Sequence, residues 1–331
     1  MPRRPVARLA RRPIAGLPIG AAGLVVLLAV VAAVGWSNTL AGFRVIGWHQ
    51  NMMNGVAPAP DQYRVLTPML AEALLTATEP ATVEDALKGL QRAYITVHLL
   101  AFTVAGFFFL AFCRHWLPLP HSLLCVALLL GVAAVANLLG QIQVTDPMHL
   151  MFVTIGLWAI RRRMLWVLLA ATIVGAVNRE SILVLMGYYV LMDWHRSKRS
   201  VLLIAALLTV AWGATYGGLR LGYGMRAYSV DVVMLEYNLE SVWRWAPPLL
   251  LLGPLMLAAL QREVGDWPGS LRRATLVIPP YLLLHLTIAR VEEVRLFLPL
   301  LPILIPLAVL GVAQHDAAAG QEDAPPKRGR P

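Results

Sequence analysis

Charged residues are scarce in this chain: Asp, Glu, Lys and Arg make up 14% of its 331 residues. A soluble domain typically has about 25% charged and roughly 45–50% apolar residues. Here the hydrophobic share is 58%. So little charge excludes an ordinary soluble domain and indicates a polytopic membrane protein.

Cysteine is almost absent as well. The two cysteines, Cys113 and Cys125, are expected near the cytoplasmic ends of membrane segments, where a disulfide is disfavoured. Two thiols alone do not make a metal site, and no metal-binding residues are identified. The chain also lacks a Gly-rich phosphate loop, a nucleophile elbow and a His-Glu-x-x-His motif. These absences exclude the soluble enzyme classes that depend on such motifs.

Acidic residues are fewer than basic ones, 18 against 28, so the formal net charge is +10. In a soluble protein such an excess can indicate a nucleic-acid partner. Here the basic residues gather in short loops between apolar runs, as the positive-inside rule requires. We therefore expect membrane lipid, and no nucleic acid, as the partner of these charges.

The apolar runs predict an all-α, polytopic transmembrane protein of about ten spans, since a helix needs roughly 20 residues to cross a bilayer. Both termini are expected in the cytoplasm of a plasma-membrane protein, because 18 of the 28 Lys and Arg residues then lie on that side. The predicted spans are 19–37, 93–113, 121–139, 147–160, 164–177, 182–194, 200–218, 246–261, 274–289 and 296–313.

The predicted organisation has three parts. Residues 1–18 form a basic cytoplasmic N-terminus, 19–313 the transmembrane domain, and 314–331 a flexible cytoplasmic tail. The run Ile19–Trp36 resembles the apolar core of a signal peptide, but it has span length and no cleavage site follows it, which favours an uncleaved first span.

Two long outer loops, 38–92 and 219–245, are expected to carry interfacial helices. One such helix is predicted over 66–78, where apolar residues recur at helical spacing. Residues 231–245 are rich in aromatic and aliphatic side chains, which suits a segment at headgroup level.

Four polar clusters fall at span ends that this topology places on one side of the membrane. The hairpins around them are short, and ionisable groups below the headgroups should pair or face a polar cavity. The clusters are Asp61-Gln62-Tyr63-Arg64, Asp146 with His149, Asn178-Arg179-Glu180-Ser181, and Glu292-Glu293-Val294-Arg295.

Each cluster also has a purely local explanation. Asp61 and Asp146 could be N-caps of the helices that follow them. Arg179 and Glu180 could neutralise each other. Glu292 with Arg295, and Glu293 with Arg290, have the spacing of pairs on one helix.

Three features resemble the GT-C-type membrane glycosyltransferases and their bacterial relatives. Asp61 is an acid in the first long outer loop, and Asn178-Arg179-Glu180-Ser181 is similar to the Lys/Arg-Glu-Ser/Thr turns of such proteins. The stretch from Glu293 to Pro302 resembles the Glu-x-Arg-x-x-x-Pro-x-x-Pro opening of a late span in that superfamily. A second acid close to Asp61 and a large soluble C-terminal domain are absent.

The resemblance implies hexosyl or pentosyl transfer from a polyprenyl-phosphate-linked sugar on the outer face. Asp61 would be the general base, and Arg64, Arg179 and Arg295 would stabilise the leaving phosphate. Glu180, a second catalytic candidate, and Glu292 would orient the arginines or bind sugar hydroxyls. The substrate-binding candidates are Gln62, Tyr63, Arg64, Asp146, His149, Asn178, Arg179, Glu292, Glu293 and Arg295.

Other readings stay open at this stage. Charged pairs and proline-broken helices also occur in transporters and lipid flippases. A non-catalytic subunit of an envelope-glycan assembly complex is a third alternative. The sequence leaves open a divalent-metal cofactor, the sugar, the acceptor and the oligomeric state.

Overall fold

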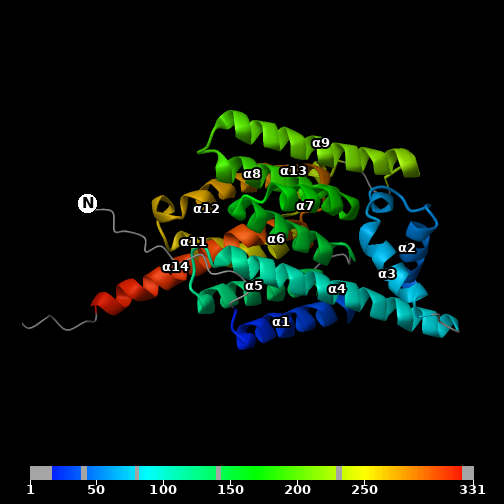
Figure 1. Ribbon diagram of the computed structural model, residues 1–331, viewed down its shortest axis with the longest axis horizontal. Helices are drawn as coiled ribbons and strands as arrows, with labels where there is room; N and C mark the ends of the chain where they lie inside the picture. The colour runs from blue at the N-terminus through cyan, green and yellow to red at the C-terminus, as the bar shows by residue number, and fades with distance from the viewer. Residues whose placement is uncertain (1–16, 39–42, 79–81, 139–142, 229–232, 323–331) are drawn as a thin grey trace, which may run out of the picture.

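The computed structural model describes residues 17–38, 43–78, 82–138, 143–228 and 233–322. It is all-α, 83% helical, with no strand in these ranges; Ala59 and Tyr228 form an isolated bridge. The helices form an elongated bundle, and α2 and α3 cover one end of it (Figure 1). We call this end the cap end.

The α-helices are α1 (Ile19–Asn38), α2 (Phe43–Met53), α3 (Leu66–Thr76), α4 (Val83–Cys113), α5 (Leu119–Leu138), α6 (Asp146–Arg162), α7 (Leu165–Asn178), α8 (Val184–Asp193), α9 (Lys198–Tyr223), α10 (Leu235–Glu240), α11 (Ala246–Leu260), α12 (Gly269–Ala274), α13 (Ile278–Ile288) and α14 (Leu301–Glu322). The 3-10 turns that matter below are η2 (Asp61–Tyr63), η3 (Glu180–Leu183), η4 (Val242–Trp245), η6 (Thr275–Val277) and η7 (Val294–Leu300).

Within the described ranges, six helices are long and apolar enough to cross a membrane: 19–36, 84–113, 119–136, 198–223, 242–260 and 294–313. All ten predicted spans coincide with helical structure, but the count of ten is not confirmed. The helix α7 has 14 residues and α8 has 10. At 1.5 Å per residue, α7 is roughly 21 Å long, short of the about 30 Å of a bilayer core.

The short helix α6 is the core of the bundle. It packs against α4, α7 and α8, and most of its 17 residues are buried. Pro147 stands in its first turn, where the missing N–H costs no hydrogen bond. Arg163, at φ 61°, ends the helix in the left-handed region. Most of α6 is thus surrounded by other helices, so its length is not set by the thickness of a bilayer.

The long first loop is more helical than its sequence predicts. The predicted helix over 66–78 is confirmed as α3, which ends at Thr76. The helix α4 begins ten residues before the predicted span, because Thr82 accepts a hydrogen bond from the Asp85 N–H at 3.1 Å. Acidic residues in this first turn also favour the helix N-terminus.

Two tyrosine hydroxyls donate to backbone carbonyls that prolines at the start of the last helix leave without an N–H donor. In 3-10 geometry, Pro299 cannot donate to Leu296 O and Pro302 cannot donate to Pro299 O. The Tyr281 hydroxyl donates to Leu296 O at 2.8 Å, and the Tyr188 hydroxyl donates to Pro299 O at 2.9 Å. This irregular start of the helix is thereby held in place directly beside Arg295.

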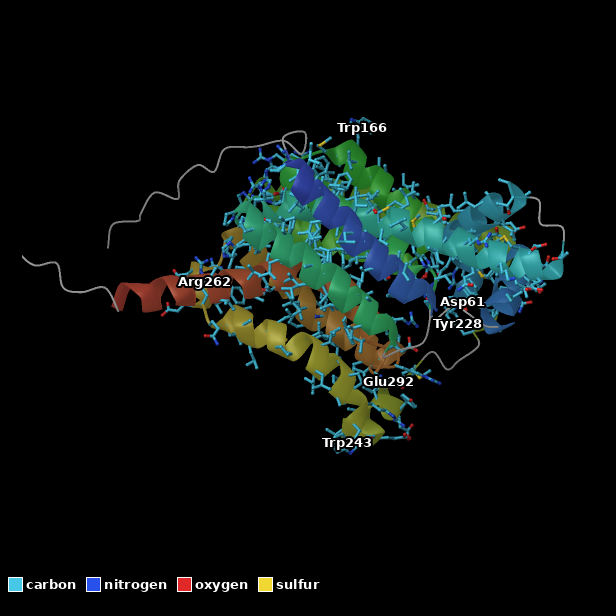
Figure 2. All side chains as sticks on the ribbon, turned by 90° about the horizontal axis from the view of Figure 1, so that it is seen from below. Asp61, Trp166, Tyr228, Trp243, Arg262 and Glu292 are labelled. Atoms are coloured by element: carbon cyan, nitrogen blue, oxygen red, sulfur yellow. The ribbon has the colours of Figure 1, made fainter. Side chains whose placement is uncertain are left out.

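Each predicted terminal segment lies partly outside the described residues. The basic segment 1–18 is described only from residue 17, and of the tail 314–331 the structure describes α14 as far as Glu322. Figure 2 shows Asp61, Tyr228 and Glu292 toward one end of the molecule and Arg262 toward the other.

Candidate functional site

The four polar clusters of the sequence converge beneath α2 and α3. We call the following residues the polar cluster: Asp61, Arg64, Gln143, Asp146, Arg179, Glu180, Glu293 and Arg295. They come from η2 and the residue after it, the start of α6 and the segment before it, the α7–η3 junction and the start of η7. Segments more than a hundred residues apart thus supply one site, with three arginines and four carboxylates.

Arg64 is the centre of the first half of the polar cluster. Its Nε donates to Glu180 Oε2 at 3.0 Å, and its Nη2 donates to the other oxygen of the same carboxylate. Its Nη1 donates to Gln143 Oε1 at 2.8 Å, and it lies 3.6 Å from Asp61 Oδ1. The paired hydrogen bonds from Arg64 to the two oxygens of Glu180 fix the plane of the guanidinium.

Asp61 is held by neutral donors as well as by the charge of Arg64. Trp48 on α2 donates from Nε1 to Asp61 Oδ2 at 3.0 Å, and Gln143 Nε2 donates to Oδ1 at 3.4 Å. The side chain remains 21% exposed. Its carboxylate is therefore oriented and still reachable from outside.

Asp146 is the centre of the second half of the polar cluster. Its carboxylate pairs with Arg179 through Oδ1 and lies 3.6 Å from Arg295 Nη1 through Oδ2. Arg295 also pairs with Glu293. The Asp146 side chain is 1% exposed, so both arginines are neutralised inside the protein rather than at its surface.

The two halves of the polar cluster form one electrostatic unit. The charges of Arg64 and Arg295 both act on Arg179, and the charges of Asp61 and Glu180 act on Arg295. Three buried guanidinium groups that repel one another are costly unless acids or a bound anion compensate them.

Several buried guanidinium donors are left without a hydrogen-bond partner: Arg179 Nε, Arg295 Nε and Arg295 Nη1. An unsatisfied buried donor on a charged group costs more than about 1–3 kcal/mol. Two of the acids are nearer the surface, since Glu180 and Glu293 are 27% and 13% exposed against 4% for Arg295. Spare donors thus lie beneath a rim of carboxylates.

The environment of Glu180 disfavours it as a proton acceptor. Burial by itself would raise its pKa, but the Arg64 guanidinium lowers the pKa of Glu180 to about 2. A general base works best with a pKa near the working pH. Glu180 is therefore better suited to holding Arg64 than to taking a proton.

The purely local explanations of the clusters do not match the geometry. Val65, not Asp61, is the N-cap of α3, and Thr145, not Asp146, is the N-cap of α6. Arg179 pairs with Asp146, and Glu180 pairs with Arg64. Glu293 pairs with Arg295 instead of Arg290, because residues 289–293 are not helical.

Two predicted substrate-binding residues instead hold the Asp61 segment. Gln62 is fully buried, accepts from the Ala57 N–H at 2.9 Å and donates to Met52 O at 3.3 Å. The Tyr63 hydroxyl donates to Gly224 O at 2.9 Å, and its ring packs under Arg220 at 4.8 Å. Both residues hold the backbone between Asp61 and Arg64 in place, and their side chains make no hydrogen bond to the polar cluster among those described.

The other candidates lie behind or beside the polar cluster. Asn178 accepts from the Thr67 hydroxyl at 2.6 Å and donates to Thr145 O at 2.9 Å, which ties α3 to α7. His149 Nε2 lies 3.2 Å from Ser181 Oγ. Glu292 accepts from the Tyr237 hydroxyl at 2.7 Å. None of the three pairs with an arginine of the polar cluster in the described structure.

Sequence reasoning missed Trp48 and Gln143, both partners of Asp61. Gln143 stands three residues before Asp146, so its position offered a signal. Trp48 offered none, because an aromatic residue in an amphipathic loop is also expected at a membrane interface.

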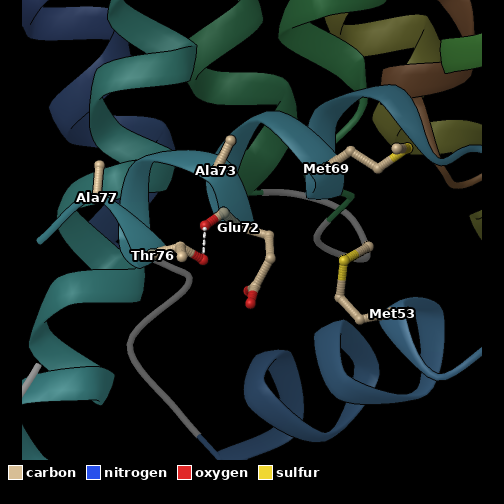
Figure 3. A pocket seen from close by; sticks show the side chains of 6 residues that line it. All are labelled: Met53, Met69, Glu72, Ala73, Thr76 and Ala77. Atoms are coloured by element: carbon tan, nitrogen blue, oxygen red, sulfur yellow. Dashed lines mark hydrogen bonds between the residues drawn. The ribbon is translucent and has the colours of Figure 1, made fainter. Parts of the chain in front are cut away.

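A shallow groove of about 550 Å³ lies between α2 and α3 (Figure 3). It is lined by Met53, Met69, Glu72, Ala73, Thr76 and Ala77. The Glu72 carboxylate lies 2.8 Å from Nε2 of the buried His49, whose Nδ1 lies 2.8 Å from the Tyr94 hydroxyl. These two contacts of His49 link α2 to α3 and α4. They thereby support α2, whose Trp48 donates to Asp61.

Comparisons with protein-family models, with curated proteins and with solved structures found no match. Within the described part of the chain, no three His, Cys, Asp or Glu side chains are arranged to hold a metal ion.

Proposed function

We propose that the protein is a membrane glycosyltransferase that takes its sugar from a polyprenyl-phosphate donor at the cap end. The observation that carries the proposal is the burial of Arg64, Arg179 and Arg295 in one cluster with unfilled N–H donors. Such donors suit a phosphate, which guanidinium groups bind in a two-pronged geometry.

The chemistry of transfer uses both signs of charge in the polar cluster. Asp61 takes the proton of an acceptor hydroxyl, whose oxygen attacks the anomeric carbon of the sugar. The bond from that carbon to the phosphate oxygen breaks, and a polyprenyl phosphate leaves with one more negative charge than it had in the donor. Arginines aimed at that developing charge stabilise the transition state.

The other acids prepare the arginines for this role. Asp146 holds Arg179 and Arg295 side by side, and Glu180 holds Arg64. When a phosphate binds, it replaces part of the pairing between Glu293 and Arg295, whose Nε and Nη1 are the nearest spare donors. With three arginines and four carboxylates the polar cluster has an excess of one negative charge before binding, so a phosphate can be bound only where it displaces an acid such as Glu293 from its arginine.

Arg295→Lys is expected to weaken binding of polyprenyl phosphate roughly tenfold to a hundredfold. The ammonium keeps the charge but loses the fork, and a charged hydrogen bond contributes about 1.5–3 kcal/mol. The purified protein in nanodiscs would be titrated with undecaprenyl phosphate and with the unphosphorylated alcohol. The matched control is Arg196→Lys, because Arg196 pairs with Asp193 at the opposite end. Equal binding of alcohol and phosphate by the natural protein would count against the proposal.

The proposal also requires the cap end to face outward. Cysteines introduced at Tyr228 and Glu84, both exposed at that end, should react with an impermeant thiol reagent in intact cells. Cysteines at Ser197 and Arg163 should react only after permeabilisation. The natural Cys113 and Cys125 are buried and give little background. The reverse labelling pattern would place the site in the cytoplasm and exclude an outer-face transferase.

A further inference from the structure

The segment formed by α10 and η4 is exposed on one side and buried on the other. Leu239, Val242 and Trp243 are 63%, 75% and 80% exposed, and Trp243 projects from the bundle in Figure 2. Asn238, on the other side of the same segment, is fully buried. The side-chain amide of a buried asparagine needs hydrogen-bond partners, and here they must come from the adjacent segment of the same protein.

Asn238 binds the connection between α13 and η7 through both ends of its side-chain amide. Its Nδ2 donates to Leu286 O at 2.8 Å and to Ala289 O at 2.7 Å. Its Oδ1 accepts from the Val291 N–H at 3.0 Å. These contacts fill both amide donors. They fix the chain up to a point four residues before Arg295.

Neighbouring contacts reinforce this attachment. The Tyr237 hydroxyl donates to Glu292, the Met234 N–H donates to Thr287 O at 2.7 Å, and Trp245 Nε1 donates to Asn238 O at 3.1 Å. The connection is thus held by α10–η4 on one side and delivers Glu293 and Arg295 to the polar cluster on the other.

We infer that Asn238 is a positioning residue for Arg295. No helix is assigned over residues 289–293, and the backbone hydrogen bonds of this connection are short-range, such as Ala289 N–H to His285 O at 3.0 Å and Glu293 N–H to Arg290 O at 3.1 Å. The direction in which η7 begins therefore also depends on contacts from outside the connection. Asn238 supplies that direction through backbone groups at residues 286, 289 and 291. The inference rests on the proposed function only for the identity of the ligand of Arg295, because the hydrogen bonds between Asn238 and the connection belong to the structure itself.

The test compares Asn238→Ala with Arg273→Ala. Arg273 is a matched control because it also bonds two backbone carbonyls at a helix end, Leu191 O at 3.0 Å and Met192 O at 2.9 Å, but belongs to α12, away from the polar cluster. Hydrogen exchange of residues 289–296 and the affinity for undecaprenyl phosphate would be measured for both.

Asn238→Ala should speed exchange over 289–296 and weaken binding by roughly tenfold to a hundredfold, because a displaced Arg295 would lose a charged hydrogen bond to the phosphate. Arg273→Ala should change neither. Unchanged exchange and affinity in Asn238→Ala would overturn the inference. If the natural protein fails to bind the lipid, the proposed function fails and exchange alone decides the role of Asn238. If Asn238→Ala does not fold, Tyr237→Phe, which removes only the hydroxyl bonded to Glu292, should speed exchange at 291–293, and no change there would equally overturn the inference.

Discussion

Asp61→Asn should abolish sugar transfer while leaving the protein folded. The amide keeps the size of the carboxylate and can still accept from Trp48 Nε1, but it cannot take a proton from an acceptor. Loss of a general base typically lowers the rate about 10²–10⁴-fold. Release of polyprenyl phosphate from polyprenyl-phosphate hexose and pentose donors, with membrane extracts as the source of acceptor, would be followed in nanodiscs.

The matched control for that experiment is Asp193→Asn. Asp193 pairs with Arg196 at the same spacing as Asp61 with Arg64, but at the opposite end of the bundle. It should leave transfer unchanged. Near-normal transfer by Asp61→Asn would exclude Asp61 as the base. A natural protein that binds polyprenyl phosphate without any transfer would favour a transporter or an assembly subunit.

Asp146→Ala should be the most destabilising single substitution in the polar cluster. It removes the only carboxylate that pairs with Arg179 among the described residues and one of two that pair with Arg295. Breaking a buried ion pair from one side typically costs about 3–5 kcal/mol. Thermal unfolding in detergent should show a large drop in midpoint or a failure to accumulate folded protein.

Two variants make this result specific. Glu84→Ala breaks the exposed pair between Glu84 and Lys88, which is expected to change stability by less than about 1 kcal/mol. The double variant Asp146→Leu with Arg179→Leu removes the stranded charge together with its partner, so it should recover part of the lost stability. An Asp146→Ala protein that unfolds like the natural one would mean that Arg179 is hydrated in the native state.

Much of the fold follows from sequence because it depends on local pattern. A run such as Ile19–Trp36 is apolar over a full span length, and α3 has the helical spacing of its apolar residues. The number of spans does not follow, because α7 is as apolar as a span yet short, and whether such a helix faces lipid depends on what surrounds it.

The candidate site was predictable as a set of polar clusters but not as a set of pairs. The sequence marks Arg64, Arg179 and Arg295 because charge is rare in this chain and expensive in a membrane. Their nearest acids along the sequence give only part of the pairing: Arg295 pairs with Glu293, but Asp61 is not the closest partner of Arg64, and Glu180 does not pair with Arg179. Arg64 makes its closest contacts with Glu180, 116 residues away, and Arg179 pairs with Asp146.

The sequence by itself thus determined that the chain is a helical membrane protein and which of its few charged residues stand at the ends of apolar segments. Composition and periodicity suffice for this, since the cost of placing charge in lipid does not depend on the fold. Only the tertiary structure decided that Asp146 lies between two arginines and that Trp48, Gln143 and Asn238 support the site. Hydrogen bonds and ion pairs act over about 3–4 Å, and the helix packing that brings distant segments so close is set by the whole bundle.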